Sequence, residues 1–174
     1  MIKTMPTSRP FLINSRPLGE QRGASLKAYC GLFEGNIIAG YGRWRDTVTP
    51  YAYAINDFLA LIEGTTPGPN TRFCVMPNNG AVSTYVTKHA PIWEARGVNG
   101  HSEVPQARDE WIRIGRDFAA GKFVIYPDYK VFRAERQKIE TLLDEIQSLA
   151  ESRSLKDDEL VRVDGHDLMV STDD

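Results

Sequence analysis

Hydrophobic positions along the chain follow two different periods. Short apolar runs bounded by Gly, Pro and Asn predict strands, and apolar residues recurring three and four positions apart predict helices. The predicted strands cover residues 10–14, 25–33, 37–45, 73–76 and 122–126. The predicted helices cover residues 51–63, 81–89, 105–120 and 134–150, with a break at Pro91. This order of strands and helices is typical of an α/β domain.

Two local features refine this pattern. Glu34, Gly35 and Asn36 form a turn sequence between the second and third predicted strands, which favours an antiparallel hairpin. Gly40 and Gly42 lie inside the third strand, and glycine within a strand indicates either a bulge or the close approach of another chain segment.

The composition divides the chain into three parts. Residues 1–9 are polar and predict a flexible N-terminal arm, residues 10–152 carry the domain, and residues 153–174 form an acidic C-terminal tail. Within this tail, two apolar runs flank Asp164-Gly165, a favoured turn pair. Two interpretations stay open here: a short hairpin, or a flexible tail with local β tendency.

The overall composition is that of one globular domain. The chain has 174 residues, 41% of them hydrophobic, which is enough for a sizeable core. Its net charge of -2 and pI of about 5.9 disfavour strong non-specific binding to nucleic acid without excluding it. The sequence has no apolar segment of about 20 residues, and its start lacks the apolar core of a signal peptide. We therefore expect no membrane interaction and a cytoplasmic location.

Several segments between residues 10 and 150, taken in their order and spacing, resemble the ribonuclease H-like family. They are Phe11-Leu12-Ile13-Asn14 before a glycine-containing loop, Ile38-Ala39-Gly40-Tyr41, Asn56-Asp57-Phe58-Leu59-Ala60-Leu61, Val75-Met76-Pro77-Asn78 and Trp93-Glu94-Ala95-Arg96-Gly97. The resemblance implies a five-stranded mixed sheet, with an antiparallel meander, parallel crossovers and helices on both faces. The alternative is another small α/β domain with similar elements.

The same resemblance implies that the active site has largely been replaced. Active members of the family hold two divalent metals with four carboxylates. By the resemblance, the corresponding positions here are Asn14, Asp57, Asn78 and Lys138. Asp57 keeps the negative charge of a family glutamate but has a side chain shorter by one methylene. Glu135 and Glu140 are the acidic residues near Lys138. If Lys138 points inward, its charge would take the place of a metal ion. We expect no metal and no cofactor, with Mg or Mn relevant only if Asp57 and Glu135 sustain a divergent nuclease.

The simpler interpretation of each position also stands. Asn14 fits a polar residue at a strand end, Asn78 fits a turn or a helix cap, and Asp57 fits a solvated charge on a helix. The candidate nucleic-acid-binding residues are Arg43, Arg45, Arg72, Trp93 and Arg96, although strand arginines are often ordinary surface charges and tryptophans often belong to the core.

Three functions follow from this. The leading hypothesis is a catalytically inactive ribonuclease H-like protein that binds a nucleic-acid duplex or a protein partner. The second is a divergent metal-dependent nuclease of the ribonuclease H type. The third is a structural or assembly protein, such as an oligomer subunit or a viral accessory factor. Fold alone does not choose among them.

Overall fold

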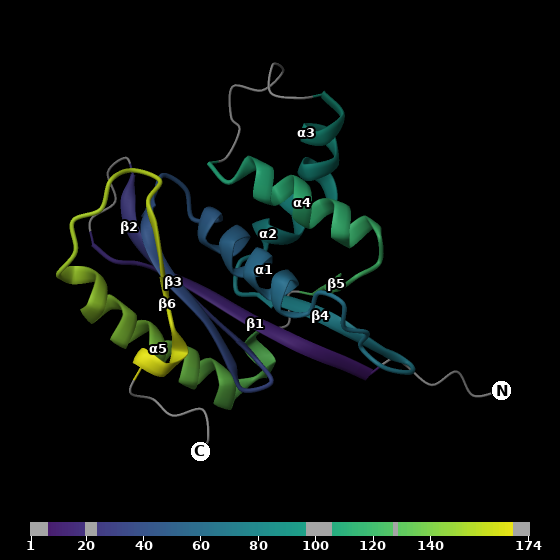
Figure 1. The fold of residues 1–174 in the computed structure, drawn as a ribbon, viewed down its shortest axis with the longest axis horizontal. Helices are drawn as coiled ribbons and strands as arrows, with labels where there is room; N and C mark the ends of the chain where they lie inside the picture. The colour runs from purple at the N-terminus through teal and green to yellow at the C-terminus, as the bar shows by residue number, and fades with distance from the viewer. Residues whose placement is uncertain (1–6, 20–23, 97–105, 127–128, 169–174) are drawn as a thin grey trace.

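A single mixed sheet forms the centre of the molecule (Figure 1). The structure is a computed structural model, and it describes residues 7–19, 24–96, 106–126 and 129–168. The strands of the described part are β1 (Thr7–Pro17), β2 (Ser25–Phe33), β3 (Asn36–Trp44), β4 (Thr71–Pro77), β5 (Val124–Ile125) and β6 (Leu160–Val163). They lie in the order β5-β4-β1-β2-β3-β6.

The pairing of the strands is the one that the resemblance to the ribonuclease H-like family implies. β1, β2 and β3 form an antiparallel meander, and β4 and β5 join β1 as parallel strands. The five predicted strands are all present, with shifted ends, and β6 adds a sixth strand beside β3. The predicted mixed sheet is thus confirmed, with one strand more than expected.

Helices cover both faces of this sheet (Figure 1). One face carries α1 (Thr49–Leu61), α2 (Ala81–Thr84), a π-helical turn η1 (Tyr85–His89), α3 (Ala90–Arg96) and α4 (Arg108–Ala119). The other face carries α5 (Arg133–Glu151), which follows the short 3-10 helix η3 (Tyr129–Val131). Alternate residues of β1 serve the two cores, because Phe11 and Ile13 pack on the α1 side and Leu12 packs on the α5 side. None of the helices in the described ranges is long and apolar enough to cross a bilayer.

The predicted break at Pro91 is wrong. Residues 81–96 run as one continuous helical segment through α2, η1 and α3. Pro91 is the second residue of α3 and directly follows the π-helical turn. Proline lacks a backbone N–H, so it is tolerated where that N–H would have no partner within the helix. The change from π-helical to α-helical hydrogen bonding before Pro91 creates such a position.

Both ends of the chain take part in the sheet. Thr7, Ser8 and Arg9 belong to β1 and pair with the first residues of β4, so the strand begins inside the predicted arm. At the other end, β6 pairs with β3 rather than with a neighbouring part of the tail, and Gly165–Asp167 forms a 3-10 helix η4. Most of the second half of the predicted hairpin, Met169 and Val170, lies outside the described residues.

Gly40 and Gly42 mark the close approach of β6 to β3. A Cβ atom at Gly40 would lie 2.6 Å from the Tyr29 hydroxyl and 2.8 Å from the Val161 carbonyl oxygen. At Gly42 it would lie 2.6 Å from the Glu159 carbonyl oxygen. Without a Cβ, both glycines leave room for neighbouring aromatic side chains and for the chain that approaches β3 at β6. Of the two predicted explanations, a bulge or a close approach, the close approach is correct.

Candidate functional site

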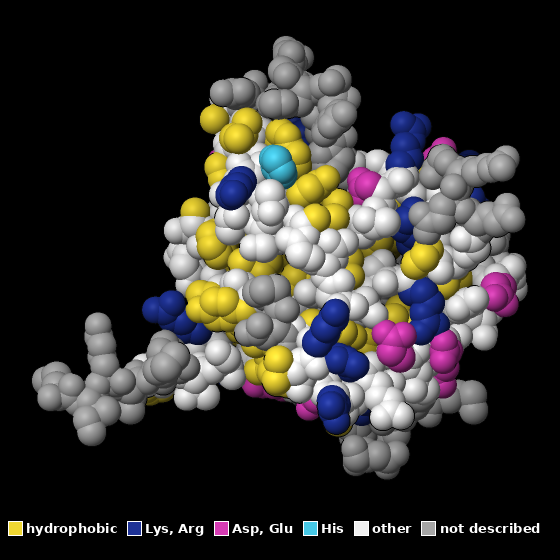
Figure 2. Space-filling model, turned by 180° about the vertical axis from the view of Figure 1, so that it is seen from behind, with side chains coloured by type: hydrophobic (Ala, Val, Ile, Leu, Met, Phe, Trp, Pro, Cys, Tyr) yellow, Lys and Arg dark blue, Asp and Glu magenta, His cyan; other side chains and the backbone are white. Residues whose placement is uncertain are grey.

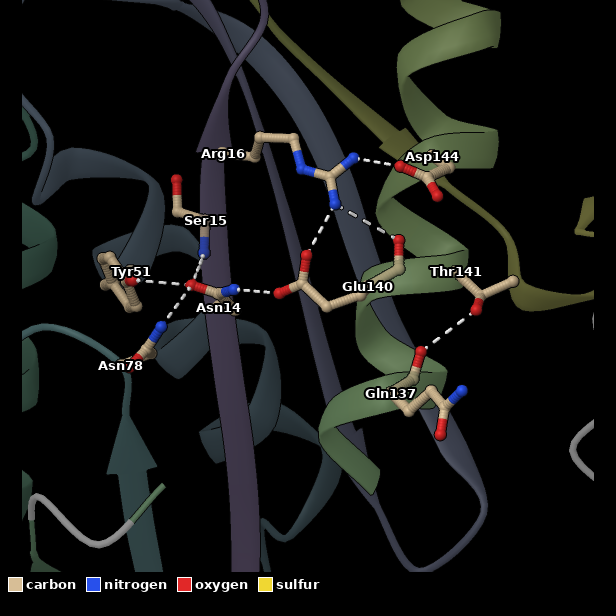
Figure 3. Close-up of polar contacts among 9 residues, drawn as sticks. All are labelled: Asn14, Ser15, Arg16, Tyr51, Asn78, Gln137, Glu140, Thr141 and Asp144. Carbon is tan, nitrogen blue, oxygen red and sulfur yellow. Dashed lines mark hydrogen bonds and ion pairs between the residues drawn. The ribbon is translucent and has the colours of Figure 1, made fainter. Parts of the chain in front are cut away.

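Asn14 is the centre of a polar cluster at the point where the parallel pairing of β1 with β4 ends (Figure 3). Ile13 pairs with Pro77, the last residue of β4, and the Asn78 backbone N–H donates to the Ile13 carbonyl at 2.9 Å, whereas β1 continues beside β2 to Pro17. The Asn78 side-chain Nδ2 donates to Asn14 Oδ1 at 3.2 Å. The structure thus brings Asn14 and Asn78 together, and Asn14 is buried with 8% of its surface exposed.

Every polar atom of the Asn14 amide has a partner. Its Oδ1 accepts from the backbone N–H of Ser15 at 2.9 Å, from Asn78 Nδ2, and from the Tyr51 hydroxyl at 3.4 Å. Its Nδ2 donates to Glu140 Oε1 at 2.7 Å. An amide accepts on one side and donates on the other, whereas a carboxylate only accepts. A carboxylate at position 14 would therefore face the Glu140 carboxylate without a hydrogen between them.

Arg16 supplies the positive charge of this cluster. Arg16 is two residues after Asn14 on β1, so both side chains reach the face that α5 covers. Its guanidinium contacts Glu140 Oε2 at 2.6 Å and also forms an ion pair with Asp144, one helical turn further along α5 (Figure 3). The two carboxylates of this part of α5 are thus held by one cation of the protein itself.

Asp57 does not join this cluster, which corrects the predicted register of the first helix. Its carboxylate pairs with Arg162 of β6, with Oδ2 2.9 Å from Arg162 Nε. α1 starts at Thr49, where Asp46 Oδ1 accepts the backbone N–H groups of Val48 and Thr49. Tyr51, in the first turn of α1, donates to Asn14 at 3.4 Å, and Asp57 lies six residues after Tyr51, roughly 9 Å further along the helix axis.

The predicted register of the last helix is also wrong. Glu140, not Lys138, is the residue of α5 that contacts Asn14. Two residues of a helix that are two positions apart point about 200° away from each other, so Lys138 cannot share the direction of Glu140. Glu135 is exposed on the first turn of α5, and the polar contacts of Asn14 include neither Glu135 nor Lys138.

Burial keeps the neighbours of Glu140 in their neutral forms. Loss of hydration raises the pKa of the Tyr51 hydroxyl above its usual range, and the negative charge of Glu140 raises it further against a lowering by its hydrogen bond with the Ser15 backbone. Burial likewise raises the pKa of the Cys30 thiol, with Glu140 adding to the shift. At neutral pH, Tyr51 is therefore a neutral hydroxyl beside Asn14.

These residues do not fit a two-metal centre. Of the four side chains that meet here from β1, α1, β4 and α5, only Glu140 is a carboxylate, and Asn14 and Arg16 already bind it. Mg²⁺ in proteins relies on carboxylate and other charged oxygen ligands. Within the described ranges, no three His, Cys, Asp or Glu side chains are grouped so that they could hold a metal ion.

Trp93, a candidate nucleic-acid-binding residue, is part of the core. Trp93 is 6% exposed and packs against His89, with ring centroids 5.5 Å apart and the rings 22° from parallel. The Tyr85 ring meets Trp93 edge to face at 5.6 Å. Trp93 therefore has no open face for a base to stack on, which corrects its prediction as a nucleic-acid contact.

The candidate arginines fall into different environments. The Arg43 guanidinium donates to the carbonyl oxygens of Leu155 at 3.1 Å and Ala24 at 3.2 Å, so it holds the tail segment against β3. Arg45 and Arg72 are exposed. The Arg96 side chain lies outside the described residues. These residues are spread over the molecule rather than gathered beside Asn14.

A groove of about 890 Å³ lies elsewhere on the molecule. It runs between the end of α1, the start of β4 and the end of α4, and Arg72 and Arg113 are among its lining residues. None of the residues that contact Asn14 lines this groove. The Asn14 cluster is thus a filled polar junction and not part of this open pocket.

Sequence reasoning missed Tyr51 and Arg16. Arg16 could have been found from the period of two along β1, because residues 14 and 16 of one strand point to the same face. Tyr51 could have been found from the helix start, since Asp46 can accept the backbone N–H of Thr49, the first residue of α1, and Tyr51 then lies in the first turn.

The architecture defines the class of fold: it is a ribonuclease H-like fold. No protein-family model and no curated protein sequence matches the chain. Among solved structures, the foamy viral protease-reverse transcriptase in complex with an RNA/DNA hybrid is similar with a TM-score of 0.58 and 12% identity, over 86% of this chain and 22% of that one. LC9-RNase H1, a type 1 RNase H with the type 2 active-site motif, is similar with a TM-score of 0.54 and 12% identity, over 96% of this chain and 82% of that one. The chain thus spans well under two thirds of the viral protein, and at these identities the likeness concerns the fold.

Proposed function

We propose that this protein is a non-catalytic ribonuclease H-like protein that binds a nucleic-acid duplex. The observation that carries the proposal is the Asn14 amide, which donates to Glu140 and accepts from Asn78 and Tyr51. That arrangement needs a neutral group that can donate, so the site is built around an amide and not around a metal-binding carboxylate.

The charge of the site supports the absence of cleavage. Metal-assisted phosphodiester cleavage uses clustered carboxylates that hold the cations next to the scissile phosphate. Here the one carboxylate in contact with Asn14 is neutralised by Arg16 at 2.6 Å. A guanidinium offers hydrogen bonds to a phosphate but cannot activate water as a metal ion does.

Two further observations support a duplex as the partner. The foamy viral protein of the same fold was solved with an RNA/DNA hybrid. In addition, α5, the helix that supplies Glu140, carries lysine and arginine residues at its start. A net charge of -2 means that only a local cationic surface can attract phosphates, so binding should be modest and weakened by salt.

The test is a titration of the protein into a short fluorescein-labelled RNA–DNA hybrid in the presence of EDTA, followed by fluorescence anisotropy. We expect saturable binding without metal, with an affinity that falls steeply between about 50 and about 200 mM salt. Absence of binding at the lower salt would overturn the duplex as partner and favour the protein-partner or assembly function. Binding that requires Mg²⁺ would favour the divergent nuclease instead.

A further inference from the structure

Four cationic side chains lie close together in sequence where η3 leads into α5. They are Lys130, Arg133, Arg136 and Lys138, and we call them the α5-start cluster. Lys130 and Arg133 are exposed, and Arg136 and Lys138 are half-buried. Figure 2 shows lysine and arginine side chains gathered in the lower part of the face that carries α5, with acidic side chains to one side.

Among the described residues, the α5-start cluster has no carboxylate partner. The ion pairs found among the described residues involve other arginines and lysines, and none involves a member of the cluster. Arg136 donates to the Lys130 backbone carbonyl at 2.7 Å, which ties the two elements together without neutralising either charge. Glu135 is the one acidic residue between positions 130 and 138, so this segment carries a net charge of +3 (four cations less one anion).

The next two acidic residues of α5, Glu140 and Asp144, already have a partner. Glu140 and Asp144 both pair with Arg16 of β1, and so they are not free to neutralise the cluster. Because Arg16 binds these two carboxylates, they do not neutralise the cations at the start of α5. The start of α5 is therefore a local positive surface on a protein of net charge -2.

We propose that the α5-start cluster is the surface on which the sugar–phosphate backbone of the duplex docks; this inference rests on the proposed function. Arg133 and Arg136 are three residues apart, so they lie on one side of α5, about 4.5 Å apart along its axis, whereas Lys138 points to another side of the helix. A duplex carries one negative charge per roughly 1.7 Å of its axis, so Arg133 and Arg136, with Lys130 just before them, can face two or three phosphates. Lysine and arginine contacts of this kind hold the backbone without reading the bases.

The partner is accordingly recognised by charge and shape. Phe132, the aromatic residue between positions 130 and 138, packs against the core, and Trp93, the candidate nucleic-acid contact, is buried elsewhere. Affinity should therefore depend little on base sequence, and a hybrid and a DNA duplex of one sequence should bind within about tenfold of each other.

The experiment compares wild type with two charge-reversal variants that change the net charge equally. The test variant is Lys130→Glu/Arg133→Glu, and the control is Arg153→Glu/Lys156→Glu beyond the other end of α5, where both residues are exposed and have no ion pair among the described contacts. An acidic residue in the first turn of a helix favours the helix, so the test variant should fold. Circular dichroism checks this before the hybrid is titrated at about 50 and about 200 mM salt.

We expect the test variant to bind at least about tenfold more weakly than wild type, and its plot of log affinity against log salt to be shallower by about 2, one for each lost phosphate contact. The control should stay within about threefold of wild type. If a folded test variant binds like wild type, or if both variants lose affinity equally, the duplex docks elsewhere and the inference fails while the proposed function stands. If wild type itself does not bind, the proposed function fails.

Discussion

α5 carries two charged regions that differ in what their charges touch. In the middle of the helix, Glu140 and Asp144 share Arg16, and Glu140 also accepts from Asn14. At its start, the four cations of the α5-start cluster have no carboxylate partner among the described contacts. The first region is satisfied from within the protein, and the second is not.

The comparison separates charges that serve the fold from charges that are free to bind. The paired groups around the buried Asn14 amide hold α5 on β1, so removing them should lower stability. Unpaired surface cations contribute little to stability, so removing them should mainly lower the affinity for a polyanion. Substitutions of charged residues should therefore change stability in the first region and affinity in the second.

The largest effect on stability is expected from Asn14→Asp/Asn78→Asp. It replaces the 2.7 Å hydrogen bond from Asn14 to Glu140 with two facing carboxylates. Unit charges 4 Å apart repel by roughly 4 kcal/mol at an effective dielectric of 20, and the half-exposed Glu140 reduces this to about 2–3 kcal/mol of unfolding free energy near pH 7. The measurement is urea unfolding of the variant and wild type in EDTA.

The pH dependence of this variant gives the sign of the effect. The repulsion should raise the folded-state pKa of the new carboxylates above the unfolded value of about 3.9, so the folded state binds more protons. Stability should then fall as pH rises from about 4 through the raised pKa and recover on acidification. Asn79→Asp is the matched control, because its side chain accepts from the Ala81 N–H and a carboxylate can do the same. A double variant as stable as wild type at neutral pH would mean that these residues do not share a site.

A smaller loss of stability is expected from Arg16→Met. Methionine keeps much of the aliphatic length but removes both ion pairs, leaving Glu140 uncompensated beside Asn14. Because Arg16 is only partly exposed and Asp144 is largely exposed, we expect about 1 kcal/mol at low salt and less at high salt. Arg116→Met, which breaks the exposed pair with Glu94, is the comparison and should cost a few tenths of a kcal/mol. Equal losses in the two variants would contradict a special role for Arg16.

The smallest effect on stability is expected in the α5-start cluster. Lys130→Ala/Arg133→Ala removes two exposed cations without an ion-pair partner among the described contacts, so the free energy of unfolding should change by less than about 0.5 kcal/mol. Thermal melts at two salt concentrations measure this. A loss above about 1 kcal/mol would show that the cluster supports the fold, and the contrast between the two regions of α5 would disappear.

The sequence predicted the sheet well because its central strands are buried on both faces and so appear as continuous apolar runs. Phe11, Leu12 and Ile13 form one apolar run, and the structure divides them between the two cores. β6 was not predicted as part of the sheet, since four residues with partly exposed side chains give a weak signal and their partner β3 is more than a hundred residues away. The spacing of hydrophobic residues along the sequence predicts which positions are buried. It does not predict which distant segments pair with each other.

The candidate site was predicted where it depends on strand ends and missed where it depends on helix register. Asn14 and Asn78 follow from the ends of two predicted parallel strands. Asp57 was assigned from the resemblance of its segment to the helix motif of the family, whereas in the structure Tyr51, near the start of α1, is the residue beside Asn14. On α5, a shift of two residues separates Lys138 from Glu140 and turns a predicted cation into an anion, which Arg16 then neutralises.

The most direct test of the account is a cleavage assay. Wild type and Glu140→Gln are incubated with a labelled RNA–DNA hybrid in the presence of Mg²⁺ or Mn²⁺, and the products are separated by gel electrophoresis. Because the one carboxylate that contacts Asn14 is held by Arg16, we expect no product above the buffer control from either protein. Metal-dependent cleavage by wild type that disappears in Glu140→Gln would contradict it.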